Sequence, residues 1–481
     1  MFSELGSFAL EEAKKKGASY ADIRIGEIQD EILTVKNGAP EEVKFLQTKG
    51  FGVRVIVDGA WGFAASVDIN KEEISRVVER AVSIAKASAK LKRKDVKLSK
   101  EEVKQDRYET PFKKDPFEVP LEEKLKVLFE AERLLAEQSR LIKASYSYYR
   151  GFKEKKFFMS TEGHEISQII TWCGGGLRAI AVKNGEMQVR SYPASFRGDF
   201  STAGYEYFES LGLVENASKV GQELLRLFEA KKCPSGVMDL ILTGDQLALQ
   251  IHESCGHPTE LDRVLGTEAD YAGTSFLTPE KLGKFMYGSK YVNIVADATV
   301  PGGLGTFGYD DEGTPAKKVY LVKEGLFVGY QSSRETAVDL NLNESSGGMR
   351  ADSPMSLPLI RMTNINLLPG DWKAEEIIED TKNGVLMMTN RSWSIDDKRI
   401  NFQFGTEIGW IIKDGSREEI VKNPTYMGVT PQFWGSCDAI SRDDWRMWGT
   451  PNCGKGVPGQ VMYVGHGCGT ARFRNVRVGL I

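Results

Sequence analysis

Histidine is scarce in this chain, with four residues in 481, and several other features are absent. No run of about eighteen apolar residues occurs, so no membrane-spanning helix is predicted. The formal net charge of −4 provides no basic excess, which argues against nucleic acid as a partner. The first residues lack a basic region followed by an apolar core, so we expect no secretory signal.

The cysteines also exclude a class of protein. The chain has six, but none forms a CxxC pair. This distribution argues against a disulfide framework and favours a reducing compartment, so we expect a cytoplasmic protein. Hydrophobic residues make up 41% of the chain and charged residues 27%, as is typical of soluble globular proteins. At this length, two or three domains are expected.

The order of helical and strand-like patterns predicts an α+β fold. The Pro/Ser/Gly-rich segment at 234–236 divides the chain into an N-terminal domain, 1–235, and a C-terminal domain, 236–481. We expect the first domain to combine antiparallel sheets with flanking helices. Predicted helices there are 4–16, 71–89, 121–138 and 205–231. Predicted strands are 20–27, 31–36, 42–47 and 51–57 in a meander, and long strands in 140–198. An Asp58-Gly59 hairpin turn is predicted to lead into a further strand at 61–67.

The second half of the chain is predicted to be β-rich around one functionally placed helix. A strand at 238–242 precedes an apolar helical segment at 245–256, and a short helix is expected near 374–382. Elsewhere short apolar runs are separated by glycine-rich turns. The helix at 245–256 carries the most informative motif of the chain at its end.

Two of the four histidines, His252 and His257, lie within six residues, and Glu253 follows the first. Two imidazoles can hold a divalent metal while a carboxylate activates water, as metal-dependent hydrolysis requires. On a regular α-helix the i and i+5 positions lie about 140° apart, too far to share a metal. We therefore predict that the backbone widens as a π-bulge, with Gly256 permitting the distortion and Pro258 ending the helix.

A catalytic zinc site needs a third protein ligand. His164 lies in an expected hairpin turn of the first domain and is predicted to be a surface residue. In the C-terminal region, Lys455 would lower the pKa of a nearby cysteine and favour its thiolate. The residues alone leave the third ligand open among a carboxylate, a thiolate and the last imidazole: Glu260, Asp262, Cys453, Cys468 or His466.

Several further segments carry a resemblance to a known family. Besides the HESCGH window, they are 309–315, 325–330, 347–350, 361–364 leading to 369–370, and Cys453-Gly454-Lys455 ahead of a glycine-rich tail. In these motifs the chain resembles the TldD/PmbA family of metalloproteases, once described as modulators of DNA gyrase. The motifs cover most of 245–481 in order, whereas the first half matches only in general layout.

The resemblance implies a TldD-like catalytic subunit. Zinc would be held by His252, His257 and the cysteine that matches Cys453, with Glu253 as general base. The tail departs from the family pattern by a longer gap after Lys455 and by an added histidine and cysteine, so Cys468 or another group stays open as third ligand. Iron, cobalt and nickel are alternative metals.

The resemblance further implies short or unfolded peptides as substrates and a dimer, either a homodimer or a heterodimer with a PmbA/TldE-like subunit. Arg350, Arg361 and Asn364 are candidates to hold peptide backbone or a terminal carboxylate, with a structural hydrogen-bonding role as the alternative. Two competing functions are a non-catalytic binding or regulatory module with a structural metal, and a metal-dependent amidase acting on a small molecule. A closed set of four ligands would favour the first, and a deep closed pocket the second.

Overall fold

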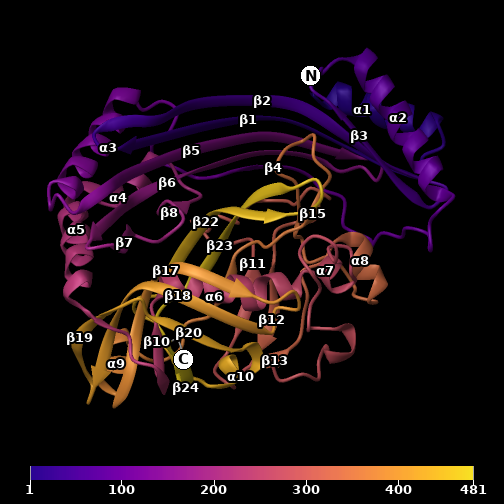
Figure 1. Ribbon diagram of the computed structural model, residues 1–481. Coiled ribbons are helices and arrows are strands. Elements are labelled where there is room, and N and C mark those ends of the chain that lie inside the picture. The colour runs from indigo at the N-terminus through magenta and orange to yellow at the C-terminus, as the bar shows by residue number, and fades with distance from the viewer. Residues whose placement is uncertain (1, 480–481) are drawn as a thin grey trace.

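The computed structural model describes residues 2–479, in which a long arched sheet lies over a β-rich C-terminal part (Figure 1). The strand order of the arched sheet is β3-β2-β1-β5-β6-β4, with β7 and β8 also paired to β6. All pairs are antiparallel except β4 with β6. The strands are β1 Tyr20–Lys36, β2 Ala39–Val57, β3 Ala60–Ser66, β4 Gln105–Glu109, β5 Ile142–Ser160, β6 Glu165–Lys183, β7 Glu186–Tyr192 and β8 Asp199–Ser201.

The strands of this sheet are longer than predicted. The four runs expected as a meander form only two strands, β1 and β2, joined by an Asn37-Gly38 turn in which both residues have positive φ. Charged residues within the strands resembled turns in the sequence. They continue the strand because β1 pairs with β2 on one side and with β5 on the other. The predicted Asp58-Gly59 turn into β3 is confirmed.

Helices pack at the two ends of the sheet, and each group buries a separate apolar core (Figure 1). Helices α1 and α2 cover one end, while α3, α4 and α5 cover the other. The helix predicted at 205–231 is broken after Ser210, because Gly212 has a left-handed φ of 57°. The bounds are α1 Phe2–Lys15, α2 Lys71–Ala89, α3 Leu121–Ala136, α4 Tyr205–Ser210 and α5 Leu213–Glu229.

The C-terminal sheet closes into a barrel, in the order β17-β10-β24-β20-β18 with β18 pairing back to β17. Strands β19 and β9 extend it from β18, and β21 pairs with β24. The strands are β9 Lys231–Lys232, β10 Gly236–Leu242, β17 Asn383–Ile395, β18 Asn401–Lys413, β19 Ser416–Lys422, β20 Thr425–Val429, β21 Cys437–Ile440 and β24 Ala471–Val478. The predicted α+β class with a β-rich C-terminal half is confirmed.

Smaller elements complete the C-terminal part. A second sheet has the order β13-β12-β11-β16, and two hairpins pair β14 with β15 and β22 with β23. The elements are β11 Ile294–Asp297, β12 Lys318–Lys323, β13 Leu326–Phe327, β14 Met349–Arg350, β15 Leu359–Ile360, β16 Ile365–Leu367, β22 Arg446–Lys455, β23 Gln460–Cys468, α6 Gly244–Ile251, α7 Leu261–Val264, α8 Arg334–Asp339, α9 Ala374–Glu379 and α10 Thr430–Gly435.

Helix α6 lies in the core of the C-terminal part. Leu247, Ala248 and Ile251 belong to a single apolar cluster with barrel residues such as Phe404 and Tyr426. From Gln246 to Ile251 every residue is buried, so the helix has no solvent face. A helix fixed on all sides holds the residues at its C-terminal end in a defined position.

Buried ion pairs join the arched sheet to the C-terminal part. Asp311 lies 3.1 Å from Lys156 of β5 and 3.9 Å from Arg24 of β1, and Glu312 lies 3.2 Å from Arg54 of β2. The first sheet uses residues 20–201 and the barrel residues 231–478. The division between 1–235 and 236–481 stays a prediction. We propose this division because the two large sheets are built from separate parts of the chain.

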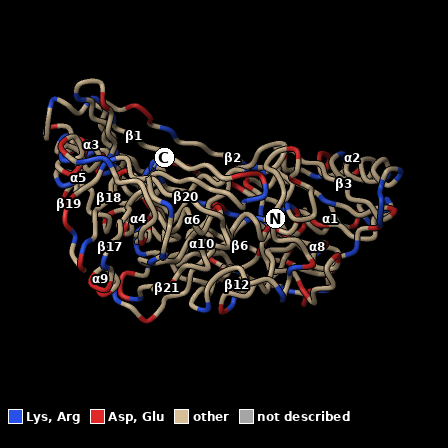
Figure 2. Tube along the Cα trace, turned by 60° about the horizontal axis from the view of Figure 1, so that its bottom comes forward, with Lys and Arg blue, Asp and Glu red and all other residues tan. Residues whose placement is uncertain are grey.

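Charges of both signs are interspersed along the surface helices α2 and α3 (Figure 2). Within residues 2–479, no helix is both long and apolar enough to cross a bilayer.

The prediction that His164 is a surface residue is wrong. This residue is buried, and its Nδ1 accepts a hydrogen bond from the Lys104 N–H at 3.2 Å.

Candidate metal centre

The predicted widening of the backbone is confirmed: α6 continues after Ile251 as a π-helix over His252–Gly256. The N–H of His257 donates to the carbonyl of His252, five residues earlier. This extra residue in the turn brings the i and i+5 side chains to one face. The two imidazole ring centres lie 4.7 Å apart, with the rings almost perpendicular at 89°.

Side chains from outside the helix satisfy the carbonyl groups that the distorted turn leaves free. The Tyr287 hydroxyl donates to the carbonyl of Ser254 at 2.8 Å, and the Thr259 hydroxyl donates to that of Cys255 at 2.8 Å. The Gln331 amide donates to the carbonyl of Gly256 at 2.7 Å. Because unpaired buried carbonyls are costly, these contacts stabilise the π-helix where it is needed.

Gly256 is required for space rather than for an unusual backbone conformation. Its φ of −57° is right-handed and available to any residue. A Cβ at this position, however, would lie 2.2 Å from Sδ of Met362, which is itself fully buried. The expectation that Gly256 permits the distortion through its flexibility is therefore corrected: its missing side chain lets the motif pack against Met362.

Cys453 on β22 supplies a third donor. Its Sγ lies 3.8 Å from Nε2 of His257, and the donor atoms of His252, His257 and Cys453 all lie within 4.8 Å of one another. All three residues are buried. Cys468 lies elsewhere, since its thiol donates to the carbonyl of Gly244 at 3.2 Å.

The remaining nitrogens of the two imidazoles are held from behind. Nδ1 of His252 lies 3.0 Å from Nε2 of His466, and Nδ1 of His257 lies 2.8 Å from Oε2 of Glu260. With the proton on each Nδ1, both Nε2 lone pairs face the cluster, as metal binding requires. His466 and Glu260, which the sequence offered as candidate ligands, thus contact the Nδ1 atoms of His252 and His257.

The charges around the cluster favour a thiolate at Cys453 and shift the two imidazoles in opposite directions. Burial alone would raise the pKa of the Cys453 thiol, but the Arg361 guanidinium and the two imidazoles outweigh it and hold that pKa well below 9.0. Burial alone would lower the pKa of His252, but the neighbouring Cys453 thiolate outweighs it and raises that pKa above 6.5. Burial lowers the pKa of His257 well below 6.5, so its ring is neutral near pH 7. The expected effect of Lys455 is replaced by that of Arg361, because Lys455 pairs with Asp262 at 2.8 Å.

Glu253 faces a cavity of about 570 Å³ that adjoins the cluster. Its carboxylate forms an ion pair with Arg399, whose φ of 65° places it in the left-handed region that non-glycine residues rarely adopt. The cavity is lined by α6, the π-helix and β22, and by residues near 196, 271 and 393–399. The lining residues are Phe196, Leu249, His252, Glu253, His257, Tyr271, Ala272, Trp393–Asp397, Arg399, Thr450 and Asn452–Gly454.

The three residues predicted to hold substrate lie in the interior, and none is among the residues lining this cavity. Arg350 donates to the carbonyls of Met362 and Tyr463, and Arg361 to that of Cys453. Asn364 binds three neighbouring groups of the glycine-rich loop and β11. These are the contacts of the structural hydrogen-bonding alternative, and a role in substrate binding stays a prediction.

Sequence reasoning did not identify Arg399, nor the supporting contacts of Tyr287 and Gln331. Arg399 follows Asp396-Asp397-Lys398 in a polar loop with no motif of its own. Tyr287 and Gln331 reach the π-helix from 33 and 75 residues away in the chain. No local pattern indicates such contacts, because they depend on how the loops pack around α6.

Three family models match the chain: "PmbA/TldA metallopeptidase domain 1" over residues 21–85, the central domain over 114–228 and the C-terminal domain over 235–480. A Methanocaldococcus jannaschii protein named as a metalloprotease is 33% identical over 94% of this chain and 95% of its own length. The chain belongs to the TldD/PmbA family. The resemblance noted in the sequence is therefore confirmed.

More distant relatives extend the comparison. A Saccharolobus solfataricus protein named "Zinc metalloprotease TldD homolog" is 23% identical, with 98% of each chain covered. A Thermotoga maritima crystal structure, described as a modulator of a DNA gyrase, superposes with a TM-score of 0.78 at 18% identity over the whole of both chains. TldE from Thermococcus kodakarensis gives 0.72 at 16% identity, with 98% of this chain and 99% of TldE covered. The structural likeness concerns the fold.

Proposed function

We propose that this chain is a zinc-dependent peptidase in which His252, His257 and Cys453 hold the metal and Glu253 is the general base. The observation that carries the proposal is the convergence of the three buried donor atoms within 4.8 Å beside a cavity that Glu253 faces. Two imidazoles and a thiolate are donors that zinc prefers, and three protein ligands are typical of catalytic sites. The metalloprotease names of relatives support the same activity.

Zinc bound there would supply a Lewis acid for a carbonyl oxygen and lower the pKa of water towards 7. Glu253, adjacent to His252, would accept the proton of the attacking water and pass it to the leaving amine. The ion pair with Arg399 holds its carboxylate at the cavity wall. Buried contacts of His466 and Glu260 keep both imidazoles oriented during the reaction.

The geometry favours catalysis over a structural metal. Among residues 2–479, the candidate ligand group has three members rather than four, and it borders a cavity instead of being enclosed. A structural site is closed by four protein ligands.

A peptide fits this cavity better than a small amide does. The cavity wall includes Trp393 to Ile395 of β17, which pairs with β18 along one edge. On the other edge, pairing with β10 ends at Met387, and no further described strand pairs there. An extended peptide can add to such an edge through main-chain hydrogen bonds, so we propose short or unfolded peptides as substrates.

We further propose that the protein is cytoplasmic and forms a dimer, either of two copies or with a TldE-like subunit. An exposed part of β2, residues 39–49, supports the dimer. Among the described strands this segment pairs with β1 alone, since β3 begins its pairing at Phe51. Phe45 and Leu46 there are 60% and 51% exposed. An unpaired apolar edge of this kind is typically covered by a partner.

Zinc content and peptide cleavage should be measured together on matched variants. Glu253→Gln should retain zinc but lose most of its cleavage, because an amide cannot accept the proton. His252→Ala and Cys453→Ala should lose zinc and activity together. Cys468→Ala removes an equally buried thiol outside the cluster and should retain both. Undiminished cleavage by Glu253→Gln, or equal zinc in Cys453→Ala, would contradict the assignment.

A further inference from the structure

A second cavity of about 660 Å³ lies between the arched sheet and the barrel and adjoins the metal cavity. Three residues, Phe196, Trp393 and Asn452, line both cavities. The rings of Phe196 and Trp393 meet edge to face with centres 5.3 Å apart. A ligand that extends from the metal cavity past these two rings therefore enters the second cavity.

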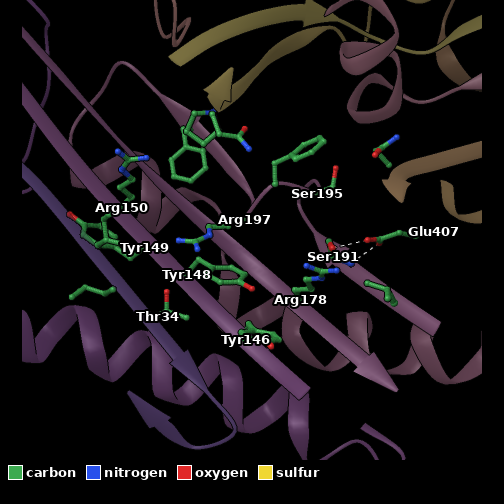
Figure 3. Close-up of a pocket in the computed structure, with 18 of the residues that line it drawn as sticks. Thr34, Tyr146, Tyr148, Tyr149, Arg150, Arg178, Ser191, Ser195, Arg197 and Glu407 are labelled. Carbon is green, nitrogen blue, oxygen red and sulfur yellow. Dashed lines mark hydrogen bonds between the residues drawn. The ribbon is translucent and has the colours of Figure 1, made fainter. Parts of the chain in front are cut away.

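Arginines dominate the charged lining of the second cavity. Figure 3 shows Arg150, Arg178 and Arg197 around it, and Arg391 completes the set. The two glutamates of the lining are already neutralised. Glu41 pairs with Lys36 at 2.6 Å, and Glu407 accepts hydrogen bonds from Ser191 and pairs with Arg190 at 3.0 Å.

The arginines are only partly neutralised. Arg150 binds Asp30 through two hydrogen bonds of 2.9 and 2.7 Å. Arg178, in contrast, is exposed and forms no hydrogen bond or ion pair with a described residue. Arg391 donates only to the neutral oxygens of Gln188, Asn423 and Met187. The cavity thus has two guanidinium groups without a carboxylate partner.

Two further features indicate a binding site. Thr34 lines the cavity, and its buried hydroxyl has no hydrogen-bond partner among residues 2–479. Phe196 and Arg197 both have left-handed φ angles, 64° and 73°, which are uncommon for residues with side chains. Such backbone strain is concentrated at functional sites. Here it positions the Phe196 ring where the two cavities meet and Arg197 in the wall of the second cavity.

We propose that this second cavity binds a carboxylate of the peptide substrate, in the subsite next to the metal centre. The inference rests on the proposed peptidase function and adds a selectivity to it. Unpaired guanidinium groups form charge-assisted, often bidentate hydrogen bonds with carboxylates. The carboxylate belongs either to an acidic side chain near the scissile bond or to the C-terminus of a short peptide.

Binding of labelled peptides to the zinc-loaded Glu253→Gln protein, followed by fluorescence anisotropy, tests this without cleavage. The probes are a short unstructured peptide with one glutamate, its glutamine counterpart, and each of these with an amidated C-terminus. We expect about tenfold weaker binding when the responsible carboxylate is removed. If the loss follows replacement of glutamate by glutamine, the bound carboxylate is the side chain; if it follows amidation, the bound carboxylate is the C-terminus. Equal binding of all four peptides overturns the proposal.

Arg178→Glu should abolish the preference for the carboxylate, and because Arg178 is exposed and unpaired this variant should fold normally. Arg80→Glu is the matched control, an exposed arginine on α2 at the opposite end of the sheet, and should retain the preference. A preference that persists in Arg178→Glu would contradict the site. Cleavage assays on wild type separate the two proposals: if no peptide is hydrolysed, the peptidase function fails, whereas the binding result still decides the subsite.

Discussion

A methyl group added at Gly256 should disrupt the metal centre by steric overlap alone. The Cβ of Gly256→Ala would lie 2.2 Å from Sδ and 3.3 Å from Cγ of Met362, a side chain with no exposed surface. Forcing a methyl group into a packed core typically costs about 1–3 kcal/mol. For a chain of 481 residues that unfolds as one unit, about 2 kcal/mol corresponds to a melting temperature lower by about 2 °C. The strain falls on the residue directly before His257, so zinc affinity should fall as well.

The assay is thermal unfolding of the metal-free protein together with zinc titration. Gly435→Ala is the matched control, because a Cβ there meets nothing within 4 Å and Gly435 ends helix α10. Alanine is the better helix former, so the control should be neutral or slightly stabilised. If Gly256→Ala unfolded at the wild-type temperature and bound zinc with wild-type affinity, the close packing of the π-helix against Met362 would not be a requirement of the site.

Three further predictions follow from contacts around the site and the sheet. His466→Phe should weaken zinc binding about 10–100-fold, measured by chelator competition, because Nδ1 of His252 loses its partner; unchanged affinity would exclude this role. Burial alone would raise the pKa of Asp311, but Lys156 and Arg24 outweigh this effect and hold that pKa below 3.8. Its stabilising contribution is thus present above pH 3.8 and lost as the pH falls below that value, so Asp311→Asn should be about 3–5 kcal/mol less stable at pH 7 and should lose less stability on acidification. Denaturant titrations from pH 7 to 3 would show parallel curves for the two proteins if this were wrong. Phe45→Lys should shift sedimentation from dimer to monomer, and a wild-type chain that sediments as a monomer would contradict the proposed edge.

Periodicity and turn chemistry were sufficient to predict much of the fold. Asp58-Gly59 and the apolar alternation on either side predicted a hairpin that the structure confirms. The lengths of β1 and β2 were missed, because charged residues in a strand paired on one or both edges resemble a turn in the sequence. Gly212 was likewise overlooked within an otherwise helical pattern, although its left-handed φ ends one helix and begins the next.

At the site, helical geometry alone predicted the distortion between His252 and His257. The choice between Cys453 and Cys468 could not be made from the residues, because it depends on which position of the β22–β23 hairpin faces α6. The resemblance favoured Cys453, and the structure brings that thiol to the histidines. Charge effects were the least predictable. Lys455 lies two residues after Cys453 in sequence, yet its ammonium group pairs with Asp262, and the more distant Arg361 acts on the thiol.

X-ray absorption at the zinc edge of the loaded protein tests the central claim most directly. A centre built from His252, His257 and Cys453 should give a single sulfur at about 2.3 Å with nitrogen or oxygen neighbours at about 2.0–2.1 Å, and Cys453→Ser should remove the sulfur scatterer. A wild-type spectrum with only nitrogen and oxygen neighbours, or a sulfur signal that persists in Cys453→Ser, would contradict the convergence of these three residues on one metal ion.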